Sequence, residues 1–202
     1  AGGEGRVAHR IRCGVERNRR RNGGVSLKTK YSAENPANRV RPGWVFTCAH
    51  PAHLLALFFG AGCLRPAPGT WGTLAGVMVW AAAVQIFPLK CLMVAIFVGF
   101  FLGVWAAQQT GEDLGVEDAG CIVIDEVVAV WFVCLWFPQN WVTWTAAFLA
   151  FRLFDIVKLP PASVIDEKMK NGWGVMLDDM LAALWALALL LALDAATAWA
   201  GK

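Results

Sequence analysis

Five carboxylates stand inside otherwise apolar stretches of this chain, and they are the residues with the clearest chemical potential. They fall in three groups: Asp125 with Glu126, Asp155 alone, and Asp178 with Asp179. Acidic side chains in apolar helices are costly, and they are usually paired, metal-bound or turned toward a polar cavity. Five such groups left unpaired would repel one another strongly. A hard divalent cation removes that repulsion, and Mg²⁺ takes oxygen ligands while keeping waters that a phosphate can replace. The pattern predicts a Mg²⁺ site for an anionic ligand, held by a subset of these five residues.

Two cations and two glycine-bearing loops accompany the acids. Arg152 and Lys158 carry positive charge suited to holding a phosphate. The loop at 65–73 opens an expected helix, where backbone amides and a threonine hydroxyl could hold an anion. The loop at 171–174 precedes the last acidic pair and lets backbone approach a ligand closely. The predicted phosphate-binding residues are Gly69, Thr70, Gly72, Gly172 and Gly174. A structural alternative stays open, because helix starts and turns need the same residues, and Arg152 could simply form an ion pair.

Other residue patterns known to act on phosphate esters find little support in the sequence. A Cys-x5-Arg pattern runs from Cys13 to Arg19, but no expected strand or helix presents it. An Asp-x-Asp-x-Thr motif is absent from the sequence, and its three histidines all precede residue 54. Of these, His53 is interpreted as a satisfied interfacial residue rather than a ligand. The six cysteines form no CxxC pair; four of them lie in apolar runs, and they are interpreted as small apolar core residues in a reduced setting.

The elements that must position these groups are apolar and helical. The 202-residue chain is 57% hydrophobic, with a mean hydropathy of +0.50. Apolar segments without strand-like alternation are expected at 44–64 (broken by Pro and Gly), 73–87, 91–107, 121–137, 141–157 and 180–200. Several are at or just under the roughly 17–25 residues that a spanning helix needs. The segments at 91–107 and 180–200 lack a polar face for water. The predicted fold is an all-α, multi-helix integral membrane bundle over residues 44–202.

Residues 1–43 differ sharply from the rest of the chain. They hold 11 Lys/Arg against 3 Asp/Glu, whereas residues 44–202 hold 7 against 12. This basic arm has almost no apolar periodicity and is predicted to be disordered. With no aromatic interleaving, it is interpreted as a solvated tail, and no nucleic-acid partner is expected. Because the chain begins at Ala1 and has no Met before Met78, the arm is also open to interpretation as sequence upstream of the natural start.

The charge asymmetry predicts a topology. The positive-inside rule places the basic arm in the cytoplasm. If the broken first segment dips into the bilayer and returns, the following helices cross alternately. Each of the three acidic groups then reaches the cytoplasmic side. This result is independent support for a shared site, because the topology follows from the basic residues and the helix order alone. The bilayer is therefore an expected partner, and the site is expected to face the cytoplasm.

Several motifs in this order resemble the phosphatidylglycerophosphatase A family. They are Pro-Gly-Thr-Trp-Gly at 68–72, Ile-Asp-Glu at 124–126, Phe-Arg-Leu-Phe-Asp-Ile-Val-Lys at 151–158, then Pro161, Asp166, Gly172, Gly174 and Val-Met-Leu-Asp-Asp at 175–179. The chain departs from the family pattern at Thr73, Ala129, Leu159 and Asn171. These departures bear on loop shape and substrate preference, and they remove no carboxylate or cation.

The resemblance implies Mg²⁺-dependent hydrolysis of the phosphomonoester of phosphatidylglycerophosphate, an anionic phospholipid, to give phosphatidylglycerol in a bacterial inner membrane. Asp125, Glu126, Arg152, Asp155, Lys158, Asp178 and Asp179 are then the expected catalytic residues. Two alternatives stay open: a cation or small-solute transporter that uses the same acids, and a soluble all-α hydrolase. The sequence leaves the oligomeric state undetermined.

Overall fold

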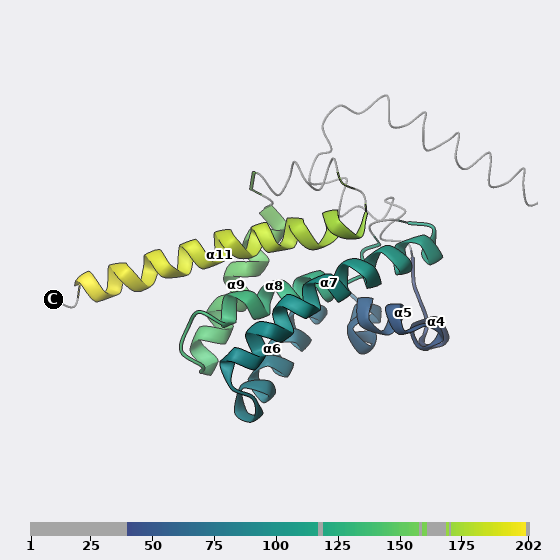
Figure 1. Ribbon diagram of the computed structural model, residues 1–202. Helices are drawn as coiled ribbons and strands as arrows, with labels where there is room; N and C mark the ends of the chain where they lie inside the picture. Colours follow the sequence, from purple (N-terminus) through teal and green to yellow (C-terminus); the bar gives the residue numbers. More distant parts are fainter. Residues whose placement is uncertain (1–39, 117–118, 158, 161–168, 170, 201–202) are drawn as a thin grey trace, which may run out of the picture. The chain divides into compact units, whose positions relative to one another are not determined.

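The computed structural model describes residues 40–116, 119–157, 159–160, 169 and 171–200, and every regular element among them is helical (Figure 1). This confirms the predicted all-α class. The elements in chain order are α4 (Trp44–Ala49), α5 (Pro51–Ala56), η1 (Phe58–Cys63), α6 (Pro68–Ile86), α7 (Leu89–Leu114), α8 (Ile124–Cys134), α9 (Trp141–Val157) and α11 (Gly172–Ala200). Most of the predicted basic arm lies outside the described residues.

The predicted helix bounds are right for α9 and shifted elsewhere for local reasons. The apolar segment at 141–157 coincides with α9. Pro68 occupies the first turn of α6, where proline suits a helix start, so α6 begins before the predicted residue 73. Gly115, with φ of 69°, ends α7 after a polar last turn that apolarity alone did not include. The predicted start of the last helix at 180 is wrong, because α11 begins at Gly172.

The first apolar segment is broken, as its glycines and its proline predicted. His50 caps α5 by accepting a hydrogen bond from the Ala52 amide at 3.2 Å, and Pro51 follows as the first helical residue. The short η1 contains a kink at Phe59 and Gly60, both with positive φ. A Cβ at Gly60 would lie 2.8 Å from the Trp44 ring, so only glycine allows this return of the chain. The segment therefore folds back instead of forming one long helix.

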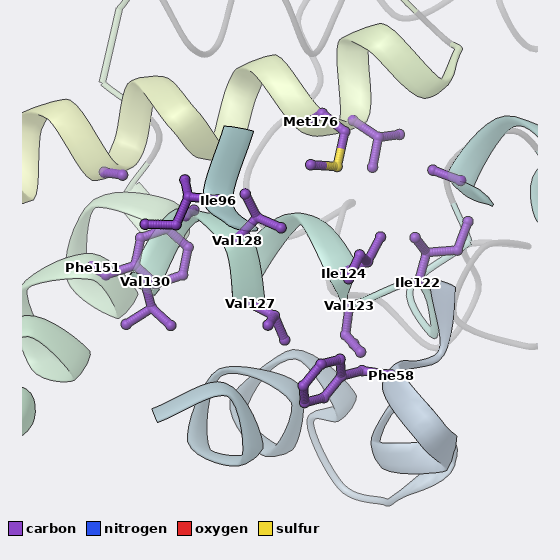
Figure 2. Packing of buried hydrophobic residues seen from close by; sticks show 14 of the residues in the cluster. Phe58, Ile96, Ile122, Val123, Ile124, Val127, Val128, Val130, Phe151 and Met176 are labelled. Carbon is purple, nitrogen blue, oxygen red and sulfur yellow. The ribbon is translucent and has the colours of Figure 1, made fainter. Parts of the chain in front are cut away.

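Helix α8 is the centre of the hydrophobic core (Figure 2). It contacts α5, α6, α7, α9 and α11, and its valines are completely buried, including Val127, Val128 and Val130. Figure 2 shows these side chains among Phe58, Ile96, Phe151 and Met176, which come from the surrounding elements. A helix that is apolar on all sides is expected at the centre of a fold. Whatever stands in the first turn of α8 is consequently held among the other helices.

Glycines on one face of α6 allow it to approach α8 closely. A Cβ at Gly72 would lie 2.5 Å from the Cβ of Val123, and one at Gly76 would lie 3.3 Å from the Val127 Cα. Gly69 lies one turn earlier on this face. The spacing of three and four residues keeps all three on one side of the helix. The small residues therefore set the distance between α6 and the start of α8.

Three described helices are long and apolar enough to cross a membrane: α6, α7 and α11. They expose many large apolar side chains, including Met78, Phe97 and Leu193. At 11 and 17 residues, α8 and α9 are shorter than these candidates. The C-terminal part of α11 extends past the other helices and is exposed from Leu191 to Trp199 (Figure 1). Long apolar helices on the outside and a short buried helix inside are consistent with membrane association.

We expect Gly72→Ala to lower stability by about 1–3 kcal/mol, because the added methyl overlaps Val123 in a tightly packed contact. Thermal unfolding of the detergent-purified protein measures the loss. Gly99→Ala is the matched control, since its Cβ would meet only Val128 at an ordinary 3.4 Å. Equal melting temperatures for both variants would contradict the close α6–α8 packing.

Candidate active site

The three predicted acidic groups come from three different helices. Asp125 and Glu126 stand in the first turn of α8, Asp155 lies near the end of α9, and Asp178 and Asp179 lie about two turns into α11. Asp125, Asp155, Asp178 and Asp179 expose 9%, 7%, 6% and 4% of their surface, respectively. The last pair was expected at the very start of its helix. The earlier start of α11 corrects that expectation and places both acids within the helical packing.

Arg152 connects two of these groups. Its Nη1 donates to Glu126 Oε1 at 2.8 Å and forms an ion pair with Asp155 Oδ2 at 2.7 Å. All three side chains are at most 14% exposed. An acidic side chain near a helix C-terminus is opposed by the helix dipole, so Asp155 gains from a guanidinium one turn earlier on α9. Arg152 thereby ties the end of α9 to the beginning of α8.

Asp179 lies close enough to interact electrostatically with Asp125, Glu126, Asp155 and Asp178. It also interacts electrostatically with Arg152. We call these five acids the carboxylate cluster. One carboxylate oxygen of Asp179, Oδ2, is buried and makes no hydrogen bond within the described part of the chain. A buried carboxylate oxygen without a donor is costly, so this atom is suited to a cation or a protonated ligand.

The first turn of α6 lies against Glu126. A Cβ at Gly69 would be 2.0 Å from Glu126 Oε1, so the absence of a side chain makes room for this carboxylate. The positive end of the α6 dipole and the Arg152 guanidinium both favour a negative charge there. Thr70 is half-buried in the same turn. Thr73 is fully buried, and its hydroxyl donates to the Gly69 carbonyl at 2.8 Å. The predicted 65–73 loop is therefore next to the acids.

Gly172 and Gly174 have structural partners in the described part of the chain. The Gly172 amide donates to Gln108 Oε1 at 2.8 Å, and the Gly174 amide donates to Asn171 Oδ1 at 3.0 Å. A Cβ at Gly172 would lie 2.2 Å from the Val104 carbonyl oxygen, and one at Gly174 would lie 1.8 Å from that of Met169. Both glycines thus serve close backbone approach and helix capping. Their predicted role in binding phosphate stays a prediction.

Gln108 is a positioning residue that the sequence interpretation did not identify. Its Nε2 donates to Glu112 Oε1 at 2.5 Å, and this orients the amide so that its oxygen faces the Gly172 N–H. The amides of the first helical turn have no partner within the helix, so this contact caps α11 from α7. The available signal was a Gln four residues before a Glu at the end of an apolar helix.

His53 has a partner on each ring nitrogen. Its Nδ1 lies 2.9 Å from the Phe46 carbonyl oxygen, and its Nε2 lies 2.7 Å from Asp113 Oδ2. The ring is 5% exposed and stacks on Phe46 with centroids 3.9 Å apart. This confirms the interpretation of His53 as a satisfied residue. It holds the α4–α5 segment at the end of α7.

Two further sequence predictions have different outcomes. Cys121 and Cys134 are buried, as expected for small apolar residues, and burial raises the pKa of the Cys121 thiol to about 12. Cys48 and Cys91 are exposed, so the interpretation as core residues is wrong for them. Lys158, the second predicted cation, lies outside the described residues. Among described residues, Arg152 is the predicted cation that reaches the carboxylates.

The cluster offers the right atoms for Mg²⁺ without a finished coordination shell. Carboxylate oxygens are the donors that Mg²⁺ prefers. However, no group of three or more His, Cys, Asp or Glu side chains in the described ranges is arranged to hold a metal ion. Arg152 occupies oxygens of Glu126 and Asp155 instead. The donor chemistry fits a magnesium ion, and binding one would require the side chains to adjust.

We expect Gln108→Ala to accelerate amide hydrogen exchange at the start of α11 by about 2- to 10-fold, because one capping hydrogen bond contributes about 0.5–1.5 kcal/mol. Hydrogen exchange with mass spectrometry on peptides covering 171–179 measures this effect. Gln109→Ala is the matched control, since Gln109 Nε2 donates to Asp113 Oδ1 instead. Unchanged exchange in Gln108→Ala would show that the cap does not hold α11.

Comparison with known proteins agrees with this architecture. The family model described as phosphatidylglycerophosphatase A matches residues 54–194. A phosphatidylglycerophosphatase A of Haemophilus influenzae is 43% identical over 146 residues, which cover 72% of this chain and 90% of the relative. That of Escherichia coli K12 is 36% identical over 137 residues, covering 67% and 79%. A Bacteroides thetaiotaomicron protein with the provisional name phosphatidylinositol-3-phosphatase is 40% identical over 145 residues, covering 68% and 89%.

No solved structure matches the chain. The family match covers more than half of the sequence, and it includes all five members of the carboxylate cluster as well as Arg152. The chain therefore belongs to the phosphatidylglycerophosphatase A family.

Proposed function

We propose that this chain hydrolyses the phosphomonoester of phosphatidylglycerophosphate, releasing phosphate and phosphatidylglycerol, with Mg²⁺ bound at the carboxylate cluster. The observation that carries the proposal is the meeting of acids from α8, α9 and α11 around Arg152, in a chain of this family. The family match favours hydrolysis over the transporter alternative. The long apolar helices support a lipid substrate over a soluble one.

Arg152 is the residue that we assign to the phosphate. A guanidinium binds phosphate oxygens through two parallel hydrogen bonds, and it stays charged throughout the reaction. Its Nε makes no hydrogen bond within the described residues, so a donor remains for a ligand. Glu126 and Asp155 both contact Nη1 of the guanidinium and hold it in place. Thr70 and the Gly69 amide lie in the neighbouring turn and could bind further phosphate oxygens.

We assign the metal to three acids other than Glu126 and Asp155, which form ion pairs with Arg152. Asp125, Asp178 and Asp179 would hold Mg²⁺, with the buried Asp179 Oδ2 as the best-supported ligand atom. When bound, the ion supplies Lewis-acid polarisation of the phosphoryl oxygens and offsets the charge of the dianionic substrate. This assignment rests on donor chemistry and burial, since no finished coordination site exists among the described side chains.

The remaining step needs a base. A carboxylate of the cluster accepts a proton from the attacking water, whose oxygen bonds to phosphorus. The bond between phosphorus and the lipid ester oxygen breaks, and that oxygen takes up a proton to become the hydroxyl of phosphatidylglycerol. Because the acids are close to one another, like-charge repulsion favours protonation of one of them. Arg152 then stabilises the charge that develops on the phosphoryl oxygens. These roles divide the cluster between holding the metal, holding Arg152 and moving the proton.

We further propose that the protein resides in a bacterial inner membrane with the cluster facing the cytoplasm. The excess of Lys/Arg in residues 1–43 supports this orientation through the positive-inside rule. The acids lie in the first turn of α8, near the C-terminus of α9 and in the early turns of α11, so all of them are on the same side of the helix bundle. A headgroup phosphate at the membrane surface would meet them there.

The central test measures phosphate release by the purified protein from phosphatidylglycerophosphate, phosphatidylinositol 3-phosphate and glycerol 3-phosphate, with Mg²⁺ or with a chelator. We expect turnover of phosphatidylglycerophosphate that disappears in the chelator and returns with Mg²⁺. Asp125→Asn and Asp179→Asn should each lower kcat by at least about 100-fold. Near-normal turnover in both variants would sink the carboxylate site, and full activity in the chelator would exclude the metal. Preference for phosphatidylinositol 3-phosphate would reassign the substrate.

A second prediction concerns the contact between α6 and Glu126. Gly69→Ala should lower kcat by roughly 10- to 100-fold, because its methyl displaces the Glu126 carboxylate and a misplacement of about 1 Å is costly in catalysis. Its melting temperature should fall less than that of Gly72→Ala, since a flexible carboxylate moves more easily than Val123. If Gly69→Ala retains full kcat, the position of Glu126 does not matter for the reaction.

A further inference from the structure

A cavity of about 330 Å³ lies between α6 and α7, away from the carboxylate cluster. Trp80 and Ala83 line it from α6, Leu92 and Ala95 from α7, and Trp131 from α8. Although α6 and α7 follow each other through a short turn at 87–88, they contact each other only sparsely. The space between these two long helices is therefore left open for something else.

The cavity offers almost nothing to a polar ligand. Both indole N–H groups in its wall are already engaged: Trp80 donates to Gln139 Oε1 at 2.8 Å and Trp131 donates to the Gly76 carbonyl at 2.7 Å. The other wall residues are apolar, apart from the thiol of Cys91 at the beginning of α7. The cavity is partly open to the protein surface, and its apolar wall makes it suited to hydrocarbon rather than to a polar ligand.

Its position corresponds to the leaflet opposite the cluster. Trp80 is 11 residues beyond Gly69 on α6, about 16 Å along the axis from the turn beside Glu126. That is beyond the middle of a hydrocarbon core of about 30 Å. The same end of the helices carries the α8–α9 turn, where Trp136 and Trp141 are 57% and 73% exposed. Exposed tryptophans are enriched at the interface of a membrane with water.

A positive charge stands at this end. Lys90 is exposed in the first turn of α7, adjacent in sequence to the lining residue Cys91. An ammonium at a membrane surface attracts anionic headgroups.

The cavity volume holds on the order of ten methylene-sized groups at about 30 Å³ each, which is the volume of one water molecule in the liquid. A helix about 10 Å across could not enter it.

We propose that this cavity binds one acyl chain of an anionic phospholipid whose headgroup lies at Lys90, in the leaflet opposite the carboxylate cluster. The bound chain fills the space between α6 and α7 and supports Trp131, and through it the buried α8. This lipid is a structural ligand, separate from the substrate. The proposal rests on membrane placement and does not depend on the reaction at the cluster.

Native mass spectrometry of the full chain in mild detergent, titrated with phosphatidylglycerol or phosphatidylcholine carrying 16-carbon chains, tests the proposal. The unmodified chain should retain one phosphatidylglycerol. Ala95→Phe fills the cavity and should weaken retention by about tenfold, because each displaced methylene contributes about 0.8 kcal/mol. Val94→Phe is the matched control, since Val94 is 57% exposed and does not line the cavity. Lys90→Gln should reduce the preference for phosphatidylglycerol by about fivefold.

Ala83→Leu provides a second filling variant on the opposite wall, should Ala95→Phe fail to fold. Equal lipid retention by Val94→Phe and by a folded filling variant would overturn the proposal. A lipid-free dimer of the unmodified chain that Ala95→Phe dissociates would overturn it too, in favour of a second copy as the occupant. None of these measurements uses phosphatase activity, so failure here leaves the proposed function untouched.

Discussion

The whole arrangement depends on the cost of gathering like charges in a protein interior. Asp125, Asp155, Asp178 and Asp179 are each less than a tenth exposed, and Glu126 is close to them. Within the described residues, Arg152 is the cation that reaches this cluster, and it pairs with Glu126 and Asp155. One guanidinium cannot offset five carboxylates at short range in a medium of low effective dielectric. The described part of the site is thereby suited to attract further positive charge.

Helix α8 brings this charge into the centre. Its valines are buried on every side, so the fold has to surround it, and its first turn carries Asp125 and Glu126 into the meeting point of α6, α9 and α11. The helix dipole favours acids at this end. The glycines of α6 complete the arrangement, because they bring the backbone against Val123 and Glu126. Gly69 and Gly72 of α6 thus lie against both the carboxylate of Glu126 and the core residue Val123. A substitution that moves α6 away from α8 would therefore disturb the core packing and the position of Glu126 together.

The long helices have a different task. In α6, α7 and α11 large apolar side chains face outward, whereas the short α8 is enclosed by its neighbours. Helix α9 also exposes apolar side chains, such as Leu149 and Leu153, over its 17 residues. The acids of the carboxylate cluster lie at one end, and the apolar cavity lies toward the other. In the proposed membrane placement, this division would let a lipid headgroup meet the carboxylates at one interface while hydrocarbon surrounds the rest of the helices.

The sequence by itself determined the helical class, the bounds of α9, the break in the first apolar segment and the acids worth considering, because apolar periodicity, proline, glycine and intramembrane charge are local signals. It did not determine that α11 begins at Gly172, that Gln108 caps it, or that Arg152 joins Glu126 to Asp155. It assigned Gly72 and Gly172 to phosphate binding, which stays a prediction, but it did not determine that they also allow close packing against Val123 and Val104. Those facts depend on contacts between residues far apart in the chain. Only the tertiary structure could decide them, since helix spacing and side-chain pairing arise when the elements pack together.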